Sequence, residues 1–223
     1  MTDQIETPTA PVLRSVRVGK IAPLGPQAVP SGFVKRSVAG PVRVSTLNLE
    51  GDAQADLSVH GGPDKAVYAY AAGQYTAWAQ DFPHHADRLV PGAFGENLTI
   101  DGLDEADICV GDIHAIGTAR LQVCQPRQPC FKLGLMFEDD RMPFLMTRNG
   151  RSGWYYRVLQ EGTLRAGDTV VLADRPNADF PLTQLIRVIY SRKGTDEDFG
   201  KIATAEGVAD WLHDTARRRL GLD

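Results

Sequence analysis

Short apolar runs separated by Gly, Pro, Asp and Asn fill the sequence from residue 13 to residue 173. Such runs, with turn-forming residues between them, predict β-strands, and many short strands in succession are typical of a β-barrel or a β-sandwich. Segments 70–82 and 132–136 have helix-like spacing instead, and the first places Tyr75 and Trp78 on one side. The sequence therefore predicts a mainly β domain with some α-helix. The predicted strands lie at 13–18, 42–47, 98–100, 113–116, 121–123 and 169–172.

From residue 175 onward the pattern becomes helical, with Leu182, Leu185 and Ile189 spaced three and four residues apart. Two further helices are predicted, near 197–204 and from about 206 to 219. We expect the three helices to form a unit with a small core of its own that includes Trp211. The predicted organisation is a mobile polar tail at 1–13, a β-rich domain at 14–174 and a three-helix domain at 175–223.

The composition disfavours several classes of protein. Lys and Arg number 24 against 28 Asp and Glu, and the resulting net charge of −4 gives no electrostatic reason to expect a nucleic-acid partner. No window approaches the roughly 18 uninterrupted apolar residues of a membrane-spanning helix, and residues 1–6 lack the basic and apolar parts of a signal peptide. We therefore expect a cytoplasmic protein that does not bind membranes, with its three cysteines as reduced thiols.

The segment VCQPRQPCFKL at 123–133 contains the most informative cysteine, Cys130. Pro126 and Pro129 each fix φ in this loop and limit how far Cys130 can move. Arg127 and Lys132 lie close to it in sequence, and nearby cations favour the thiolate, which is the form that attacks an electrophile or binds a soft metal. The alternative is a buried structural cysteine in a proline-rich turn.

The segment VHGGPDKAVY combines His60, Gly61, Gly62 and Lys65. The two glycines let backbone amides approach a ligand closely, and Lys65 adds a positive charge suited to phosphate. This combination predicts an anion pocket. The alternative is a turn that precedes a strand.

The remaining candidates are less specific. Glu96 and Asn97, in the glycine turn FGENL, either contribute to a site or satisfy backbone groups of the loop. Cys109 lies in an apolar run, where packing explains it, and Cys124 precedes Cys130 by six residues, which is not a zinc-knuckle spacing. The sequence has no Cys-x-x-Cys pair and no Gly-x-Ser-x-Gly, Walker or Rossmann pattern. Zinc and iron–sulfur sites are therefore disfavoured.

Taken in order, the segments GD, HGGPDKAVYAY, FGENLT, GD, QPRQPCFKL and GWYYRVL, with GD downstream, resemble the MOSC domain, which is named from the C-terminal part of molybdenum cofactor sulfurase. Within that family the chain is similar to the bacterial YiiM-type members, which carry a small three-helix domain and detoxify N-hydroxylated purines such as hydroxylaminopurine. The resemblance covers roughly residue 18 to residue 223. It implies an α+β fold, namely a MOSC-type β-barrel followed by a small C-terminal three-helix domain.

The resemblance also implies a cofactor, the molybdopterin form of the molybdenum cofactor. Its metal would be held by the pterin dithiolene, by oxo groups and by one protein cysteine, which matches Cys130 as metal ligand and catalytic residue. The other motif positions are the candidates for binding the cofactor, with charge indicating which of them touch its phosphate. They are His60, Gly61, Gly62, Lys65, Glu96, Asn97, Arg127 and Lys132.

The function implied by the resemblance is the reduction of small N-hydroxylated substrates to amines. Because the chain has no flavin, haem or iron–sulfur pattern, we expect its electrons to come from a separate electron-donor protein through a small, transient interface. The alternative is a carrier of molybdenum cofactor or sulfur that performs no reduction. A non-catalytic anion-binding domain and a homodimer are also left open by the sequence.

Overall fold

The computed structural model describes residues 10–222, so residues 1–9 of the predicted tail lie outside the described residues. Strand β1 begins within the remainder of that tail, at Val12. The strands are β1 (Val12–Val18), β2 (Ala22–Leu24), β3 (Val29–Ser31), β4 (Arg36–Ser37), β5 (Val42–Val44), β6 (Val67–Ala71), β7 (Leu98–Asp101), β8 (Ile113–Ile116), β9 (Ala119–Pro126), β10 (Trp154–Gln160), β11 (Gly162–Leu164) and β12 (Val170–Asp174).

Helices lie between the strands and after the last of them. The α-helices are α1 (Leu57–His60), α2 (Gly73–Asp81), α3 (Phe131–Phe137), α4 (Met142–Asn149), α5 (Leu182–Ser191), α6 (Asp196–Thr204) and α7 (Asp210–Leu220), and two 3₁₀ helices are η1 (Pro63–Lys65) and η2 (Pro83–Arg88). The predicted α+β class is confirmed, although helices contribute about as much of the chain as strands do. No helix within residues 10–222 is long and apolar enough to cross a membrane.

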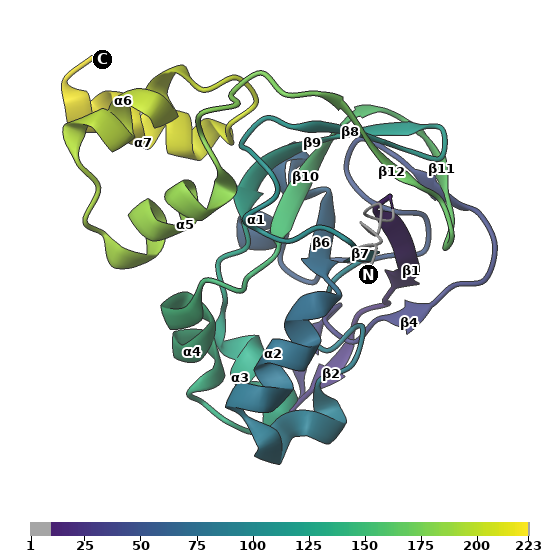
Figure 1. Cartoon of the computed structure of the whole chain (residues 1–223). Helices are drawn as coiled ribbons and strands as arrows, with labels where there is room; N and C mark the ends of the chain where they lie inside the picture. Colours follow the sequence, from purple (N-terminus) through teal and green to yellow (C-terminus); the bar gives the residue numbers. More distant parts are fainter. Residues whose placement is uncertain (1–9, 223) are drawn as a thin grey trace, which may run out of the picture.

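An eight-stranded sheet is the largest layer, with the strand order β12-β8-β9-β10-β6-β7-β1-β4 (Figure 1). Its neighbouring strands run antiparallel except for β6 and β7, which run parallel and are connected through α2 and η2. Every residue of β6 is buried, as expected for a strand near the middle of a sheet that is covered on both faces. Two small sheets, β5 with β11 and β2 with β3, flank the large one.

The large sheet curls until its two ends approach each other. The N–H of Leu13 in β1 donates to the carbonyl of Asp168 at 2.9 Å, and the Leu13 carbonyl accepts from the N–H of Gly167 at 2.8 Å. Val170, at the start of β12, donates to the carbonyl of Pro11 at 2.8 Å. The strand predicted at 169–172 therefore lies beside the first strand. The sequence predicts a barrel, and the structure has a strongly curved sheet in its place.

The helix predicted over 70–82 is wrong at its beginning. Tyr70 lies in β6, where it pairs with Thr99 of β7, and the helix α2 starts only at Gly73. A strand buried on both faces lacks the alternation of polar and apolar residues that identifies a strand. Its last apolar residues were therefore assigned to the helix that follows. Tyr75 and Trp78 are both buried on α2, as predicted.

Below the sheet, α2, α3 and α4 form a separate helical lobe with η2 (Figure 1). This lobe has its own apolar cluster, rich in aromatic side chains that pack at ring-centroid distances such as 4.5 Å between Tyr70 and Phe94. The cluster reaches the sheet through Tyr68 and Tyr70 of β6. The lobe therefore covers one side of the central strands.

The C-terminal helices α5, α6 and α7 lie beside β9, at the upper left of Figure 1. Thr195 begins α6 with a capping box, in which its hydroxyl accepts from the N–H of Asp198 and the Asp198 carboxylate accepts from the N–H of Thr195. The expectation of a separate core that includes Trp211 is wrong. The buried apolar residues of these helices belong to the same cluster as the sheet core, and Trp211 is 39% exposed and lines a cleft.

Candidate functional site

Six of the predicted site residues line one cavity of about 90 Å³, which we call the inner cavity. It lies where β6 and β10 meet loops 32–35 and 52–55. The structure thus brings together side chains from six separate parts of the chain, namely 31–35, 52–55, 60–68, 94–97, 127–132 and Tyr155. The six predicted residues are His60, Lys65, Asn97, Arg127, Cys130 and Lys132.

Cys130 lies at the start of α3, in the loop that follows β9. The main chain is held just before it, since the N–H of Arg127 donates to the carbonyl of Gly153 at 3.2 Å. Burial alone would raise the pKa of the half-buried Cys130 thiol. A hydrogen bond from His60, the charge of Arg127 and the N–H of Lys132 outweigh burial and lower this pKa to about 7. A large share of Cys130 is therefore thiolate near neutral pH.

Arg127 is buried, with 5% of its surface exposed. Its guanidinium carbon lies 5.6 Å from the ring centroid of Phe33 and 5.3 Å from that of Tyr68. Its Nη1 also contacts the sulfur of Met146 at 3.2 Å. Because aromatic faces and a thioether stabilise this cation in place of a carboxylate, its charge remains available to an anion in the cavity.

Two lysines at the cavity are anchored through main-chain carbonyls. The Nζ of Lys65 donates to the carbonyl of Val59 at 2.5 Å, and the Nζ of Lys132 donates to the carbonyl of Pro30 at 3.2 Å. Burial lowers the pKa of Lys65. Each ammonium group has three N–H donors, so both lysines can donate further hydrogen bonds to a bound anion.

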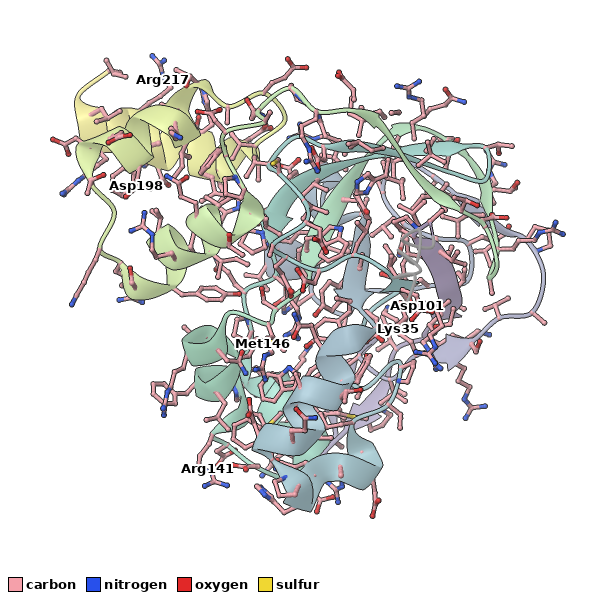
Figure 2. The ribbon with its side chains drawn as sticks, viewed as in Figure 1. Lys35, Asp101, Arg141, Met146, Asp198 and Arg217 are labelled. Atoms are coloured by element: carbon pink, nitrogen blue, oxygen red, sulfur yellow. The ribbon has the colours of Figure 1, made fainter. Side chains whose placement is uncertain are left out.

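Lys35 and Asp52 form a buried ion pair at the same cavity, with 2.5 Å between Lys35 Nζ and Asp52 Oδ1. The Asp52 carboxylate also accepts from the N–H of Gly19 at 2.7 Å and from the side-chain amide of Asn97 at 2.9 Å. Burial lowers the pKa of Lys35. Figure 2 shows Lys35 between the sheet and the helical lobe. Sequence reasoning missed Lys35, because its partner is 17 residues away; Gly51-Asp52 in the motif was the available signal.

The glycine turn before β7 has a mainly structural role. Asn97 does line the cavity, but its Oδ1 accepts from the N–H of Tyr68 at 3.1 Å, which fixes β6. Glu96 is fully buried, does not line the cavity and accepts hydrogen bonds from Gly92 at 2.5 Å and Thr99 at 3.0 Å. The reading in which the Glu96 carboxylate satisfies loop groups therefore fits its surroundings better than cofactor contact.

Gly61 and Gly62 do not line the inner cavity either. A side chain at Gly61 would lie 2.8 Å from the carbonyl of Leu57, and Gly62 has a φ of +92°, which only glycine adopts readily. These glycines shape the turn between α1 and η1. They thereby place His60 and Lys65 at the cavity from the two sides of that turn.

The other two cysteines pack away from the cavity, as expected. Cys109 is 5% exposed, and its Sγ lies 3.7 Å from the carbonyl of Ala178. Cys124 is fully buried, with its Sγ 3.2 Å from the carbonyl of Asp64. Burial raises the pKa of both thiols. Neither is prepared to act as a thiolate.

A larger cleft of about 800 Å³, which we call the outer cleft, adjoins the inner cavity. The two share Cys130 and also His60, Lys65, Lys132 and Tyr155 among their lining residues. The rest of the outer cleft is built differently, since its lining contains one charged side chain, Asp56, among apolar and neutral groups. Loop 128–131 and α7 contribute four of the uncharged residues, namely Gln128, Pro129, Phe131 and Trp211.

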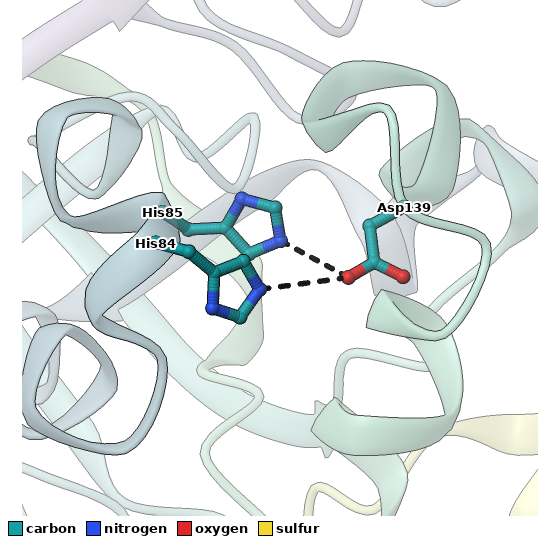
Figure 3. A group of neighbouring side chains, drawn as sticks. All are labelled: His84, His85 and Asp139. Carbon is teal, nitrogen blue, oxygen red and sulfur yellow. Dashed lines mark hydrogen bonds and ion pairs between the residues drawn. The ribbon is translucent and has the colours of Figure 1, made fainter.

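A second group of potential ligand side chains lies in the helical lobe. Figure 3 shows His84 and His85 of η2 facing Asp139, with Asp139 Oδ2 at 4.0 Å and 3.1 Å from their Nε2 atoms. Arg141 donates to both oxygens of this carboxylate, at 2.9 Å and 2.8 Å. The hydrogen bonds from Arg141, and then from His85, hold the pKa of Asp139 well below its usual range. The group ties η2 to the α3–α4 turn, and a metal ion there would have to compete with Arg141.

The inner cavity is suited to an anion and a soft metal together. Asp52 balances Lys35, which leaves the positive charges of Lys65, Arg127 and Lys132 to attract negative groups. A thiolate beside them is a ligand for soft metals. A cofactor that carries both a phosphate and a thiophilic metal therefore fits the residues present.

The model of the MOSC domain matches residues 56–171, which contain the anion motif and Cys130. Protein YiiM of Escherichia coli strain K12 is 37% identical over 206 residues, or 92% of this chain and 91% of that protein. A protein named Reductase from Gibberella moniliformis is 37% identical over 221 residues, which is 98% of this chain but 39% of that longer protein. The crystal structure of YiiM from Geobacillus stearothermophilus superposes with a TM-score of 0.79 at 32% identity, over 94% of this chain and 99% of that one.

The similarity to known proteins extends beyond residues 56–171, the segment that the MOSC model matches. The relatives cover the C-terminal helices as well as the sheet, so the resemblance noted from separate motifs holds over nearly the whole chain. Of the nine candidate site residues in those motifs, all line the inner cavity except Glu96 and the two glycines. On these grounds the chain belongs to the MOSC domain family.

Proposed function

We propose that this protein is a molybdenum-cofactor-dependent reductase that converts small N-hydroxylated compounds to amines. The observation that carries the proposal is the position of Cys130, a cysteine whose pKa is lowered to about 7, in the wall of a cavity with excess positive charge. MOSC membership and the fungal relative named Reductase also support an oxidoreductase.

Within this proposal each lining residue has a task. Cys130 supplies the protein thiolate that binds the metal, and His60 and the N–H of Lys132 orient that thiolate through hydrogen bonds. Lys65, Lys132 and the buried Arg127 hold the phosphate end of the cofactor. Lys35 and Asp52 keep the cavity open by bridging loops 32–35 and 52–55.

The proposed reaction consumes two electrons and two protons. The N–O bond of R–NHOH breaks, the nitrogen keeps one hydrogen and gains another as R–NH₂, and the oxygen leaves as water. The bound cofactor supplies the two-electron redox chemistry. The chain positions the substrate and supplies a donor for protons near the N–O bond, for which His60 is available at both the cavity and the cleft.

A separate electron-donor protein belongs to the proposal. Reduction needs two electrons in each cycle, and neither the thiol at the cavity nor its lysines can supply them repeatedly. A redox partner of this kind docks through a small interface. The exposed apolar side chain of Phe131, 61% exposed beside Cys130, is the nearest candidate contact.

The test is expression in a host that makes molybdenum cofactor, followed by metal analysis and an assay of 6-hydroxylaminopurine reduction to adenine with a chemical reductant. We expect stoichiometric molybdenum and adenine formation for the unaltered protein. Cys130→Ser should lose both, because the soft ligand is replaced by a hard hydroxyl.

Cys109→Ser is the matched control, since Cys109 packs away from the cavity; it should retain molybdenum and turnover. If the unaltered protein holds stoichiometric molybdenum but forms no amine from several N-hydroxylated substrates, it is a cofactor carrier. If Cys130→Ser retains full molybdenum and activity, the assignment of the metal ligand is wrong.

A further inference from the structure

Trp211 differs from the two other tryptophans of the chain. Trp78 and Trp154 are fully buried, whereas Trp211 is 39% exposed at the N-terminal end of α7. An exposed indole contributes little to the core and is free to present one face to a ligand.

The main chain and the side chain of this region are nevertheless fixed firmly to the sheet domain. Ala209 N–H donates to the carbonyl of Cys124 at 3.0 Å, and Asp210 N–H donates to Asp64 Oδ2 at 2.9 Å. The indole N–H of Trp211 donates to Gln125 Oε1 at 2.9 Å.

Gln125 is itself buried and is held by the carbonyl of Asp64, which accepts from its Nε2 at 2.9 Å. Three consecutive residues at the start of α7 are therefore tied to the sheet domain, Trp211 among them. Its indole is held in a fixed orientation without being buried. Such preorganisation lowers the entropy lost when a ligand binds against it.

Trp211 faces the outer cleft, which it lines together with Cys130. Phe131 and Tyr155 add aromatic surface to the same cleft, and the exposed side chain of Gln128 adds an amide that can both donate and accept hydrogen bonds. The volume of about 800 Å³ lies within the range of roughly 300–1,000 Å³ typical of small-molecule sites. Lys65 and Lys132, the cations of this lining, are shared with the inner cavity, whereas Asp56 lines the outer cleft alone.

We propose that the outer cleft is the substrate compartment and that Trp211 is a specificity residue that stacks on the flat ring of a heteroaromatic N-hydroxylated compound. The inference rests on the proposed function and deepens it. The inner cavity, at about 90 Å³, receives the charged and metal-bearing part of the cofactor, the substrate ring lies against the indole, and the N-hydroxyl group points toward Cys130, which both compartments share. The C-terminal helices thereby take part in substrate choice.

The experiment compares two substitutions in the cofactor-loaded protein. Trp211→Leu keeps apolar bulk without an aromatic face, and Trp211→Phe keeps a face without the indole N–H. Binding of adenine, the flat reaction product, which has no N–O bond left to reduce, is measured by calorimetry. Molybdenum content is measured alongside, and kinetics are compared for 6-hydroxylaminopurine and for hydroxyurea, which has the N-hydroxyl group but no ring. Phe144→Leu is the control, since Phe144 is 65% exposed in α4 and does not line the cleft.

Stacking on an aromatic side chain contributes about 1–3 kcal/mol per base, so Trp211→Leu should weaken adenine binding roughly 5- to 100-fold and raise the KM for 6-hydroxylaminopurine similarly. The kcat, the molybdenum content and the KM for hydroxyurea should stay within about twofold. Trp211→Phe should keep most of the affinity, and Phe144→Leu all of it.

Two results would overturn the inference: unchanged adenine binding in Trp211→Leu, or loss of molybdenum from that variant, which would place the cofactor in the outer cleft. A failure of the proposed function looks different. In that case the unaltered protein reduces neither compound, while Trp211 still determines whether adenine binds.

Discussion

The inner cavity and the outer cleft share Cys130, yet they are built from different parts of the chain and with different chemistry. The inner cavity is narrow, carries excess positive charge and is supported by the buried pair of Lys35 and Asp52. The outer cleft is wide, and beyond the shared wall its lining combines aromatic, amide and aliphatic groups with the single carboxylate of Asp56, with Trp211 supplied by the C-terminal helices. Under the proposed function, positive charge would hold the cofactor and aromatic surface would receive the substrate.

The largest effect is expected at the support of the inner cavity. Asp52→Asn leaves the buried ammonium of Lys35 without its counter-charge, and breaking a buried ion pair in this way costs about 3–5 kcal/mol in the free energy of unfolding. Urea denaturation measures it. Asp101→Asn is the matched control, because the Arg14–Asp101 pair has side chains 55% and 52% exposed and should contribute under about 1 kcal/mol. Equal losses of unfolding free energy in Asp52→Asn and Asp101→Asn would show that the buried pair stabilises the fold no more than the exposed pair does.

The next effect concerns cofactor retention. Arg127→Met removes a buried charge while keeping an unbranched chain between Phe33 and Tyr68. A charge-assisted hydrogen bond contributes about 1.5–3 kcal/mol, so the affinity for the cofactor should fall roughly 10- to 100-fold and less molybdenum should remain after dialysis. Arg141→Met, at an exposed arginine of the helical lobe, should retain molybdenum. Full occupancy in Arg127→Met would mean that the charge of the inner cavity does not hold the cofactor.

A pH effect of about tenfold is expected for Cys130 itself in cofactor-free protein. Only the thiolate reacts with iodoacetamide, and a pKa of about 7 makes the labelling rate rise about tenfold from pH 6 to pH 8 and then level off. His60→Ala removes a hydrogen bond to the thiolate and should move the midpoint to higher pH. Mass spectrometry of the labelled peptides measures the rates. Cys109 and Cys124, whose pKa values burial raises, should stay unlabelled in the folded protein. A midpoint near that of a free cysteine would contradict the electrostatic account of the site.

The smallest effect is expected in the outer cleft. Gln128→Ala removes one exposed amide, and a single neutral hydrogen bond contributes about 0.5–1.5 kcal/mol, so the KM for 6-hydroxylaminopurine should rise roughly 2- to 10-fold. Molybdenum content should not change, because Gln128 does not line the inner cavity. Steady-state kinetics together with metal analysis separate the two quantities. If Gln128→Ala lost molybdenum without a change in KM, the assignment of the cofactor to the inner cavity and of the substrate to the outer cleft would be contradicted.

The parts of the site that sequence could predict are those that are local in the chain. Arg127, Cys130 and Lys132 lie within six residues, so their mutual influence was visible as a motif. Lys35 was not predictable, because its role depends on a contact with Asp52 that only the fold creates. Trp211 is a similar case. Helical spacing placed it on an apolar face, but a hydrogen bond to Gln125, 86 residues earlier, holds it at the cleft.

The fold shows the same division between local and long-range information. The helix predicted near 197–204 agrees with α6 to within one residue, and the capping box of Thr195 and Asp198 that begins it lies within four positions of the chain. Strand β6 was missed, because a strand buried on both faces lacks alternation and is recognisable only from its neighbours β7 and β10. The third C-terminal helix starts at Asp210 and not near 206, because Gly207 adopts a φ of +78° that ends the preceding turn.

The position of α7 in the chain has a consequence for the order in which the molecule is assembled. A growing polypeptide completes every strand of the large sheet, and all the lining of the inner cavity, before residue 210 has been synthesised. At that stage the cavity has its charges and its thiol, but the wall provided by Trp211 does not yet exist. If the proposed function holds, a cofactor that binds at this stage would meet a wider opening than the one that remains after Ala209 and Asp210 have docked onto Cys124 and Asp64.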